Sequence, residues 1–111
     1  MARIKKIQLK ITSIKKKILP ILRRYPVTQA GLFGSVVSGN YRRLSDIDIL
    51  VKIAEGSGMS LFDLVGMQMD LEKVLKRKVD LVEYKTVKPA LKDFILPNEI
   101  RIYETDHPTS Y

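Results

Sequence analysis

The sequence predicts an α/β (α+β) domain in which helices flank a small mixed β-sheet. Two segments, residues 4–22 and 61–76, repeat apolar residues at three- and four-residue steps, which is typical of amphipathic helices. Short apolar runs of strand length alternate with them, and 111 residues are the size of one domain. We therefore expect one domain over residues 1–104, with a frayed tail over residues 105–111.

The N-terminal half contains one long helix and two strands. Residues 4–22 place isoleucines on one face and lysines mainly on the other. Pro20 cannot donate into the helical ladder, so we expect a kink or a restart near it. Residues 27–33 and 46–53 form strands, and residues 35–45 between them form a short helix or turn and a loop.

The C-terminal half adds a second helix, a strand, a short helix and a last strand. Ser60 followed by Asp63 resembles a capping box, so a helix begins there and continues to about residue 76. The remaining elements are a strand over residues 78–84, a short helix over residues 87–96 and a strand over residues 99–104.

Composition excludes several classes of site. The chain has no cysteine, so it has no disulfide, thiolate metal site or cysteine nucleophile. Its single histidine, His107, lies in the tail, so any metal site must be built from carboxylates. No apolar stretch is long enough to span a membrane and no secretory signal is present, so we expect a cytoplasmic protein that does not bind membranes.

Charge is distributed unevenly along the chain. Residues 1–45 contain eleven lysines and arginines and no acid, whereas residues 46–111 contain nine basic and twelve acidic residues. A cationic half of this kind attracts nucleic acid, nucleotide phosphates or an acidic protein surface. The alternative is a solvated helix face.

Asp46 and Asp48 are the first candidate site residues. They are two apart at the start of a predicted strand, so both side chains leave the sheet on the same face. Two adjacent carboxylates repel each other unless a cation lies between them, and their hard oxygen atoms suit Mg²⁺ or Mn²⁺. Alone, such a pair is also typical of solvated acids at a strand edge.

Gly34 and Ser35 follow the strand over residues 27–33. They enter a turn whose backbone amides and hydroxyl group can hold a phosphate. No Gly-Lys-Ser/Thr follows, so this is not a Walker A loop, and the glycine spacing differs from that of a dinucleotide-binding motif. An ordinary strand-to-helix turn is the alternative.

Asp80 interrupts the apolar alternation of residues 78–84. A buried carboxylate needs a partner, so Asp80 either pairs with a neighbour such as Lys78 or faces solvent at a sheet edge. If this strand lies beside residues 46–53, Asp80 instead joins the two other aspartates in a cluster of three carboxylates.

The spacing of these residues resembles a known signature. Gly34-Ser35, ten further residues and then Asp46-Ile47-Asp48 are similar to the motif of the DNA polymerase β-like nucleotidyltransferase superfamily. Asp80 stands where the third carboxylate of that superfamily is expected. Residues 1–104 are similar in order and spacing to the minimal nucleotidyltransferases, which are the MNT antitoxins encoded with HEPN toxins.

This resemblance implies a nucleotidyltransferase fold and a two-metal transfer of a nucleoside monophosphate. Asp46 and Asp48 would bind two Mg²⁺ ions, one of them shared with Asp80. The donor would be ATP, the leaving group pyrophosphate, and the acceptor a tyrosine hydroxyl of a HEPN RNase toxin, with which the chain would form a hetero-oligomer.

The same resemblance assigns the nucleotide phosphates to Gly34 and Ser35. The chain departs from the family at Ser38, where many relatives carry arginine before the glycine. Arg42 or Arg43 would substitute for that contact.

Two other functions stay open from the sequence. One is a noncatalytic antitoxin that neutralises its partner by binding, although such a protein has no need of three clustered carboxylates. The other is a nucleotidyltransferase that acts on RNA, which the basic first half favours and the low aromatic content of 7% disfavours.

Overall fold

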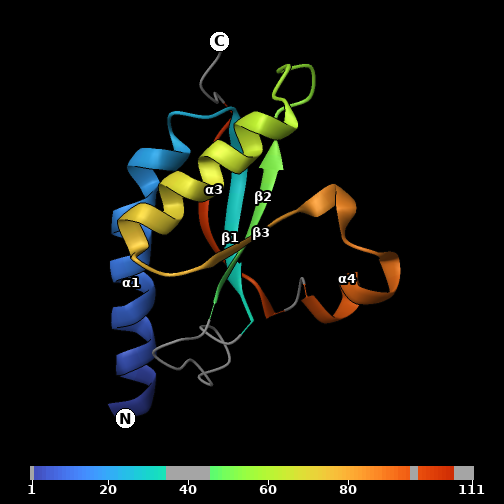
Figure 1. The fold of residues 1–111 in the computed structure, drawn as a ribbon. Helices are drawn as coiled ribbons and strands as arrows, with labels where there is room; N and C mark the ends of the chain where they lie inside the picture. The colour runs from blue at the N-terminus through green and yellow to red at the C-terminus, as the bar shows by residue number, and fades with distance from the viewer. Residues whose placement is uncertain (1, 35–45, 96–97, 107–111) are drawn as a thin grey trace.

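A computed structural model describes residues 2–34, 46–95 and 98–106 of the chain. The described elements follow the predicted order (Figure 1). Their bounds are α1 (Ala2–Leu22), β1 (Val27–Phe33), β2 (Ile47–Ile53), α3 (Leu61–Leu75), β3 (Val79–Glu83), the 3₁₀ turn η1 (Tyr84–Thr86), α4 (Pro89–Ile95) and β4 (Ile100–Glu104).

The four strands form one sheet in the order β3-β2-β1-β4. β1 is antiparallel to both of its neighbours, whereas β2 and β3 are parallel. A parallel pair needs a crossover connection, and α3 provides it. The predicted mixed sheet flanked by helices is thereby confirmed.

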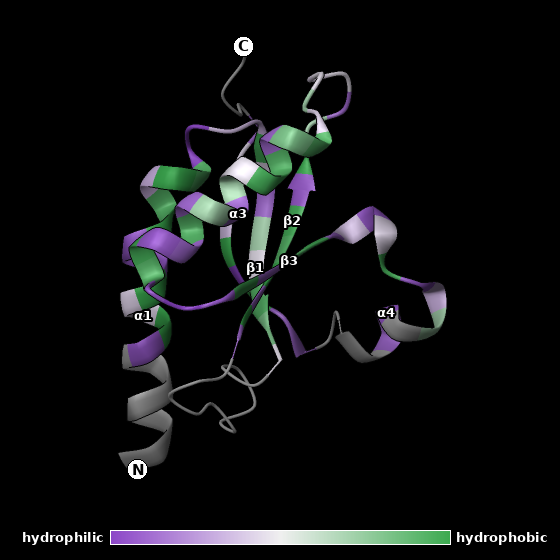
Figure 2. Ribbon diagram, in the orientation of Figure 1, coloured by the Kyte–Doolittle hydropathy of each residue, from purple (hydrophilic) through white to green (hydrophobic). Residues whose placement is uncertain are grey.

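The helices α1 and α3 lie side by side over one face of the sheet (Figure 1). Apolar residues gather on these helices and on the central strands (Figure 2). The core between the layers contains fully buried side chains from each: Ile18 and Leu22 of α1, Ile49 of β2, and Met67 and Leu71 of α3. This apolar layer fixes which face of β2 is packed against the helices, and the opposite face carries Asp48 and Lys52 together with the buried Leu50.

The capping box predicted for α3 is present. The Ser60 side chain accepts from the Asp63 amide at 3.2 Å, and the Asp63 carboxylate accepts from the Ser60 amide at 2.9 Å. The helix ends at Lys76, which adopts the left-handed conformation with a φ of 55°.

Two observed features differ from the predictions, apart from small shifts in element bounds. α1 is one helix that contains Pro20 and ends at Leu22, so the predicted restart is absent, because the amide that Pro20 lacks would serve only the last turn. The predicted strand over residues 78–84 ends at Glu83, and the unpredicted turn η1 begins at Tyr84. Predictions for residues 35–45 and 107–111 lie outside the described residues.

Within the parts of the chain that the structure describes, no helix is long and apolar enough to cross a membrane.

Candidate active site

Two of the predicted acids meet on neighbouring strands. Asp48 of β2 and Asp80 of β3 are direct neighbours in the parallel register. Since side chains alternate across a strand, both project from the face opposite to Ile47 and Ile49, which are buried under the helices. Asp46 precedes β2 by one residue and is exposed. The predicted juxtaposition of Asp80 with the first two aspartates is therefore found at the level of the strands.

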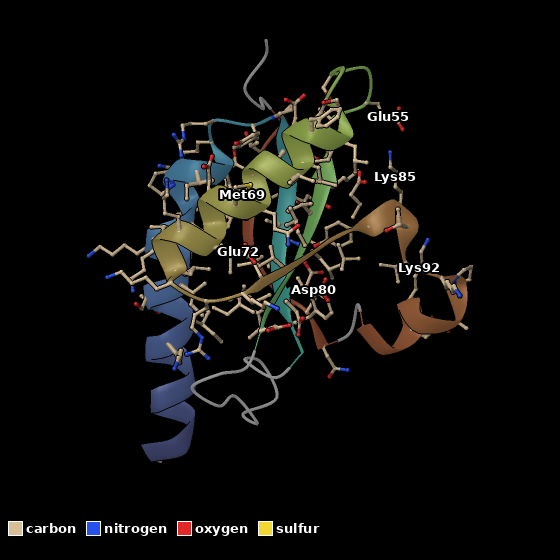
Figure 3. The ribbon with its side chains drawn as sticks, in the orientation of Figure 1. Glu55, Met69, Glu72, Asp80, Lys85 and Lys92 are labelled. Carbon is tan, nitrogen blue, oxygen red and sulfur yellow. The ribbon has the colours of Figure 1, made fainter. Side chains whose placement is uncertain are left out.

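Asp80 is exposed and lies on β3, an edge strand of the sheet that the described residues form (Figure 3). The expectation that Asp80 needs a partner to offset burial does not apply, because its side chain is exposed. Asp80 faces solvent at a sheet edge, which is one of the alternatives predicted for it. It is also the register neighbour of Asp48.

Gly34 lies against the carboxylate of Asp48. Phe33 at the end of β1 pairs with Asp48 across the antiparallel ladder, so the next residue turns over the side chain of that aspartate. Gly34 has a φ of 76°, and a Cβ atom there would overlap Oδ2 of Asp48. Only glycine satisfies both the left-handed backbone and this close approach.

Burial and like charges act together on Asp48. Burial, followed by the charges of Asp80 and then Asp46, raises the pKa of the Asp48 carboxyl to about 6. Asp48 therefore carries a penalty from burial and from its two acidic neighbours. A cation placed among them would remove this penalty.

The donor set fits a magnesium ion in chemistry. Asp46, Asp48 and Asp80 offer only oxygen ligands, which Mg²⁺ prefers, and the absence of a side chain at Gly34 lets the Asp48 carboxylate lie against the backbone of the turn. In residues 2–34, 46–95 and 98–106, no three acidic or histidine side chains are yet arranged closely enough to hold a metal. The strands determine where the three aspartates lie, and their side chains would have to rotate to bind one metal ion together.

The predicted phosphate-binding residues are only partly visible. Gly34 is described, whereas Ser35, Ser38, Arg42 and Arg43 lie outside the described residues.

A second polar cluster lies on the same face of the sheet and was not predicted. The Glu99 side chain is only 4% exposed, and its carboxylate accepts hydrogen bonds from the Tyr84 hydroxyl and from Nε of Arg101 at 3.0 Å. It rests on Gly31 of β1, where a Cβ atom would overlap it. Burial, followed by the hydrogen bond to Glu99, raises the pKa of Tyr84. A glycine in the middle of an apolar strand was the one sequence signal of this close approach.

A cleft of about 850 Å³ opens beyond Tyr84, between the end of β2 and the loop over residues 54–60. Its lining includes Lys52, Lys85 and Lys92, the last two on η1 and α4 (Figure 3). None of the described catalytic candidates lines this cleft. The cleft is therefore separate from Asp46, Asp48 and Asp80.

Comparison with known sequences adds to this geometry. The family model described as "Polymerase beta, Nucleotidyltransferase" matches residues 16–108. A candidate protein adenylyltransferase of Methanocaldococcus jannaschii is 44% identical over 92 residues, which are 83% of this chain and 97% of that protein. The protein adenylyltransferase MntA of Thermococcus cleftensis is 34% identical over 86 residues, covering 78% of this chain and 82% of that protein.

Solved structures similar to this chain include a nucleotidyltransferase and two toxin-antitoxin structures. A minimal nucleotidyltransferase is similar with a TM-score of 0.70 and 30% identity, over 82% of this chain and 91% of that one. A toxin-antitoxin structure with AMP-PNP gives a TM-score of 0.69 and 26% identity, over 83% and 74% of the two chains. A structure of the tri-AMPylated HEPN toxin of Shewanella oneidensis with an MNT antitoxin, at 23% identity and a TM-score of 0.65 over 85% and 72%, shares the fold.

Proposed function

Because this chain belongs to the polymerase β nucleotidyltransferase family, we propose that it is a Mg²⁺-dependent protein adenylyltransferase that silences a cognate HEPN toxin in the cytoplasm. In this function, AMP passes from ATP to a tyrosine hydroxyl of the toxin. The observation that carries the proposal is the in-register pair Asp48 and Asp80, with Gly34 folded against Asp48.

The relatives support the choice of acceptor and partner. Three relatives above 30% identity are named for protein adenylylation, and a toxin-antitoxin structure at 26% identity contains the ATP analogue AMP-PNP. The HEPN partner and its tyrosine acceptor rest on the resemblance of the sequence to the MNT antitoxins.

The chemistry follows from where each residue stands. The tyrosine oxygen attacks the α-phosphorus of ATP, a new P–O bond forms, and the bond to the departing pyrophosphate breaks. Asp46, Asp48 and Asp80 would hold two Mg²⁺ ions, which supply charge neutralisation at the transferred phosphoryl group and lower the pKa of the acceptor hydroxyl. Asp80 would orient the acceptor from the open edge of the sheet.

The turn after β1 would bind the rest of the triphosphate. Gly34 brings the backbone close to Asp48, so amides of this turn and the Ser35 hydroxyl would hold the β and γ phosphates near the carboxylates. Arg42 or Arg43 would add a charged contact to the same phosphates.

The test is transfer of label from α-³²P-ATP in the presence of Mg²⁺ and the HEPN protein encoded beside this chain. We expect label on the toxin, none after chelation of Mg²⁺, and none with Asp48→Asn. The matched control is Asp106→Asn, which removes an exposed carboxylate away from the site. Label found only on added RNA, or full activity of Asp48→Asn, would contradict the proposal.

A further inference from the structure

The outer side of α3 carries four large apolar side chains that face solvent. Leu61 is 74% exposed, Phe62 89%, Val65 45% and Met69 62%. Their spacing of three and four residues places them on one side of the helix, which we call the α3 stripe. Scattered single apolar residues on a surface are ordinary, whereas a continuous row on one helix marks an interaction site.

The other sides of α3 are already occupied. Met67, Leu71 and Leu75 are buried in the core. Asp70 faces the turn after α1, because its carboxylate accepts a hydrogen bond from the Tyr25 hydroxyl at 2.8 Å. Among the described residues, the α3 stripe is therefore the apolar side of this helix that is exposed to solvent.

The acids of α3 are all engaged within the molecule. Asp63 caps the helix, Asp70 binds Tyr25, and Glu72 accepts from the Val79 amide at 3.0 Å. These carboxylates are held in place by their own chain.

The lysines around the α3 stripe have a different setting. Lys73 lies four residues beyond Met69 on the same row, and Lys76 follows at the end of the helix, both exposed. The C-terminal end of the apolar row is thus followed by two exposed lysines, Lys73 and Lys76, which we call the lysine border.

We propose that the α3 stripe and its lysine border are the docking surface for the toxin, a partner whose contact surface has an apolar centre and a rim of carboxylates. The inference rests on the proposed function, because that function supplies the partner. A second copy of this chain is a poor occupant, since it would bring two sets of lysines together between molecules that each carry a net charge of +8.

The position of this surface separates docking from chemistry. α3 covers one face of the sheet (Figure 1). By the alternation of side chains along β2 and β3, Asp48 and Asp80 project from the other face. Loss of the α3 stripe therefore weakens binding of the toxin and leaves the nucleotide site intact.

The experiment compares a double variant, Phe62→Gln with Met69→Gln, with the wild-type chain. Toxin affinity is measured by calorimetry, and affinity for AMP-PNP is measured on the same proteins. Since both side chains are exposed, circular dichroism should show an unchanged fold. We expect toxin binding to weaken about tenfold or more, with AMP-PNP binding unchanged. The matched control Ala90→Gln, an exposed position on α4, should bind the toxin as wild type does.

The lysine border is tested by Lys73→Glu. We expect slower association with the toxin at low salt and a smaller difference near 1 M salt, where the Debye length falls to about 3 Å.

Three results overturn the inference. A double variant that binds the toxin as tightly as wild type contradicts the surface and leaves the proposed function standing. A double variant that changes only from dimer to monomer assigns the α3 stripe to a second copy. A wild-type chain that binds no toxin contradicts the partner of the proposed function, and the docking surface with it.

Discussion

Asp48 and Glu99 are two carboxylates associated with the same sheet in opposite electrostatic settings. Asp48 has Asp80 and Asp46 as charged neighbours, and burial together with their repulsion raises its pKa to about 6. Glu99 is more deeply buried, but Arg101 and Tyr84 both donate to it. Among residues 2–34, 46–95 and 98–106, no cation is thus paired with Asp48, whereas Glu99 is paired with Arg101.

This difference distinguishes buried acids that serve a binding site from buried acids that stabilise the fold. A carboxylate whose donors all come from the fold is satisfied, and its removal affects stability. A carboxylate placed among like charges destabilises the empty protein, and such an arrangement persists at sites that bind an external cation. We therefore expect opposite results when the two acids and their neighbours are changed.

The largest effect is expected at Asp48. Asp48→Ala should reduce AMP transfer by about a thousandfold or more, because several kcal/mol of transition-state stabilisation is lost with the metal ligand. The free energy of unfolding without metal should stay equal or rise, because a source of repulsion is removed. Transfer assays and urea denaturation measure the two quantities. Loss of activity through unfolding would place Asp48 with Glu99 as a structural acid.

The next effect concerns Asp80. Asp80→Asn should lower the chemical step by about a hundredfold, roughly 2.7 kcal/mol, because this residue would position the acceptor. Binding of AMP-PNP should change much less, because the turn at Gly34 and the other two aspartates would hold the nucleotide. Calorimetry alongside single-turnover kinetics separates these effects. A parallel loss of affinity and rate would make Asp80 a general ligand of the bound nucleotide instead.

A change at Arg101 tests the role of Glu99, whose carboxylate accepts from Arg101 and Tyr84. Arg101→Met should lower the free energy of unfolding by about 2 kcal/mol, since it leaves the buried Glu99 carboxylate without its cation. Nucleotide transfer per folded molecule should remain close to wild type. The double variant Arg101→Met with Glu99→Met removes both charges and should recover part of the stability. If Arg101→Met reduces transfer and spares stability, this cluster belongs to the active site.

The sequence predicted the first of these acids and missed the second for a physical reason. Asp48 and Asp80 could be found because strand periodicity fixes their faces, and the register of β2 with β3 needed only that the two strands be neighbours. Glu99 precedes its strand, and its contact with Gly31 depends on β4 pairing with β1, a long-range choice that local pattern does not encode.

The helices show the same division. The capping box of α3 could be predicted because it involves residues three apart. The exposure of Phe62 could not be predicted, because α3 carries apolar residues on more than one side. Only the packing of α1 and the sheet determines which of these residues are covered.

The smallest effect, on pH, tests the comparison directly. The pKa of Asp48 in the folded protein, about 6, is above its ordinary value of 3.8, so between these values the folded state holds a proton that the unfolded state has released. Without metal, the free energy of unfolding should therefore fall as pH rises from about 4 to about 6, by about 1 kcal/mol after allowance for solvent screening. Asp48→Asn should remove this contribution, and Asp93→Asn, at an exposed position on α4, should keep it. Mg²⁺ at pH 7 should restore stability in the wild type and not in Asp48→Asn. A pH slope that survives in Asp48→Asn would mean that another group carries it and that the repulsion among the three aspartates is too weak to prepare a cation site.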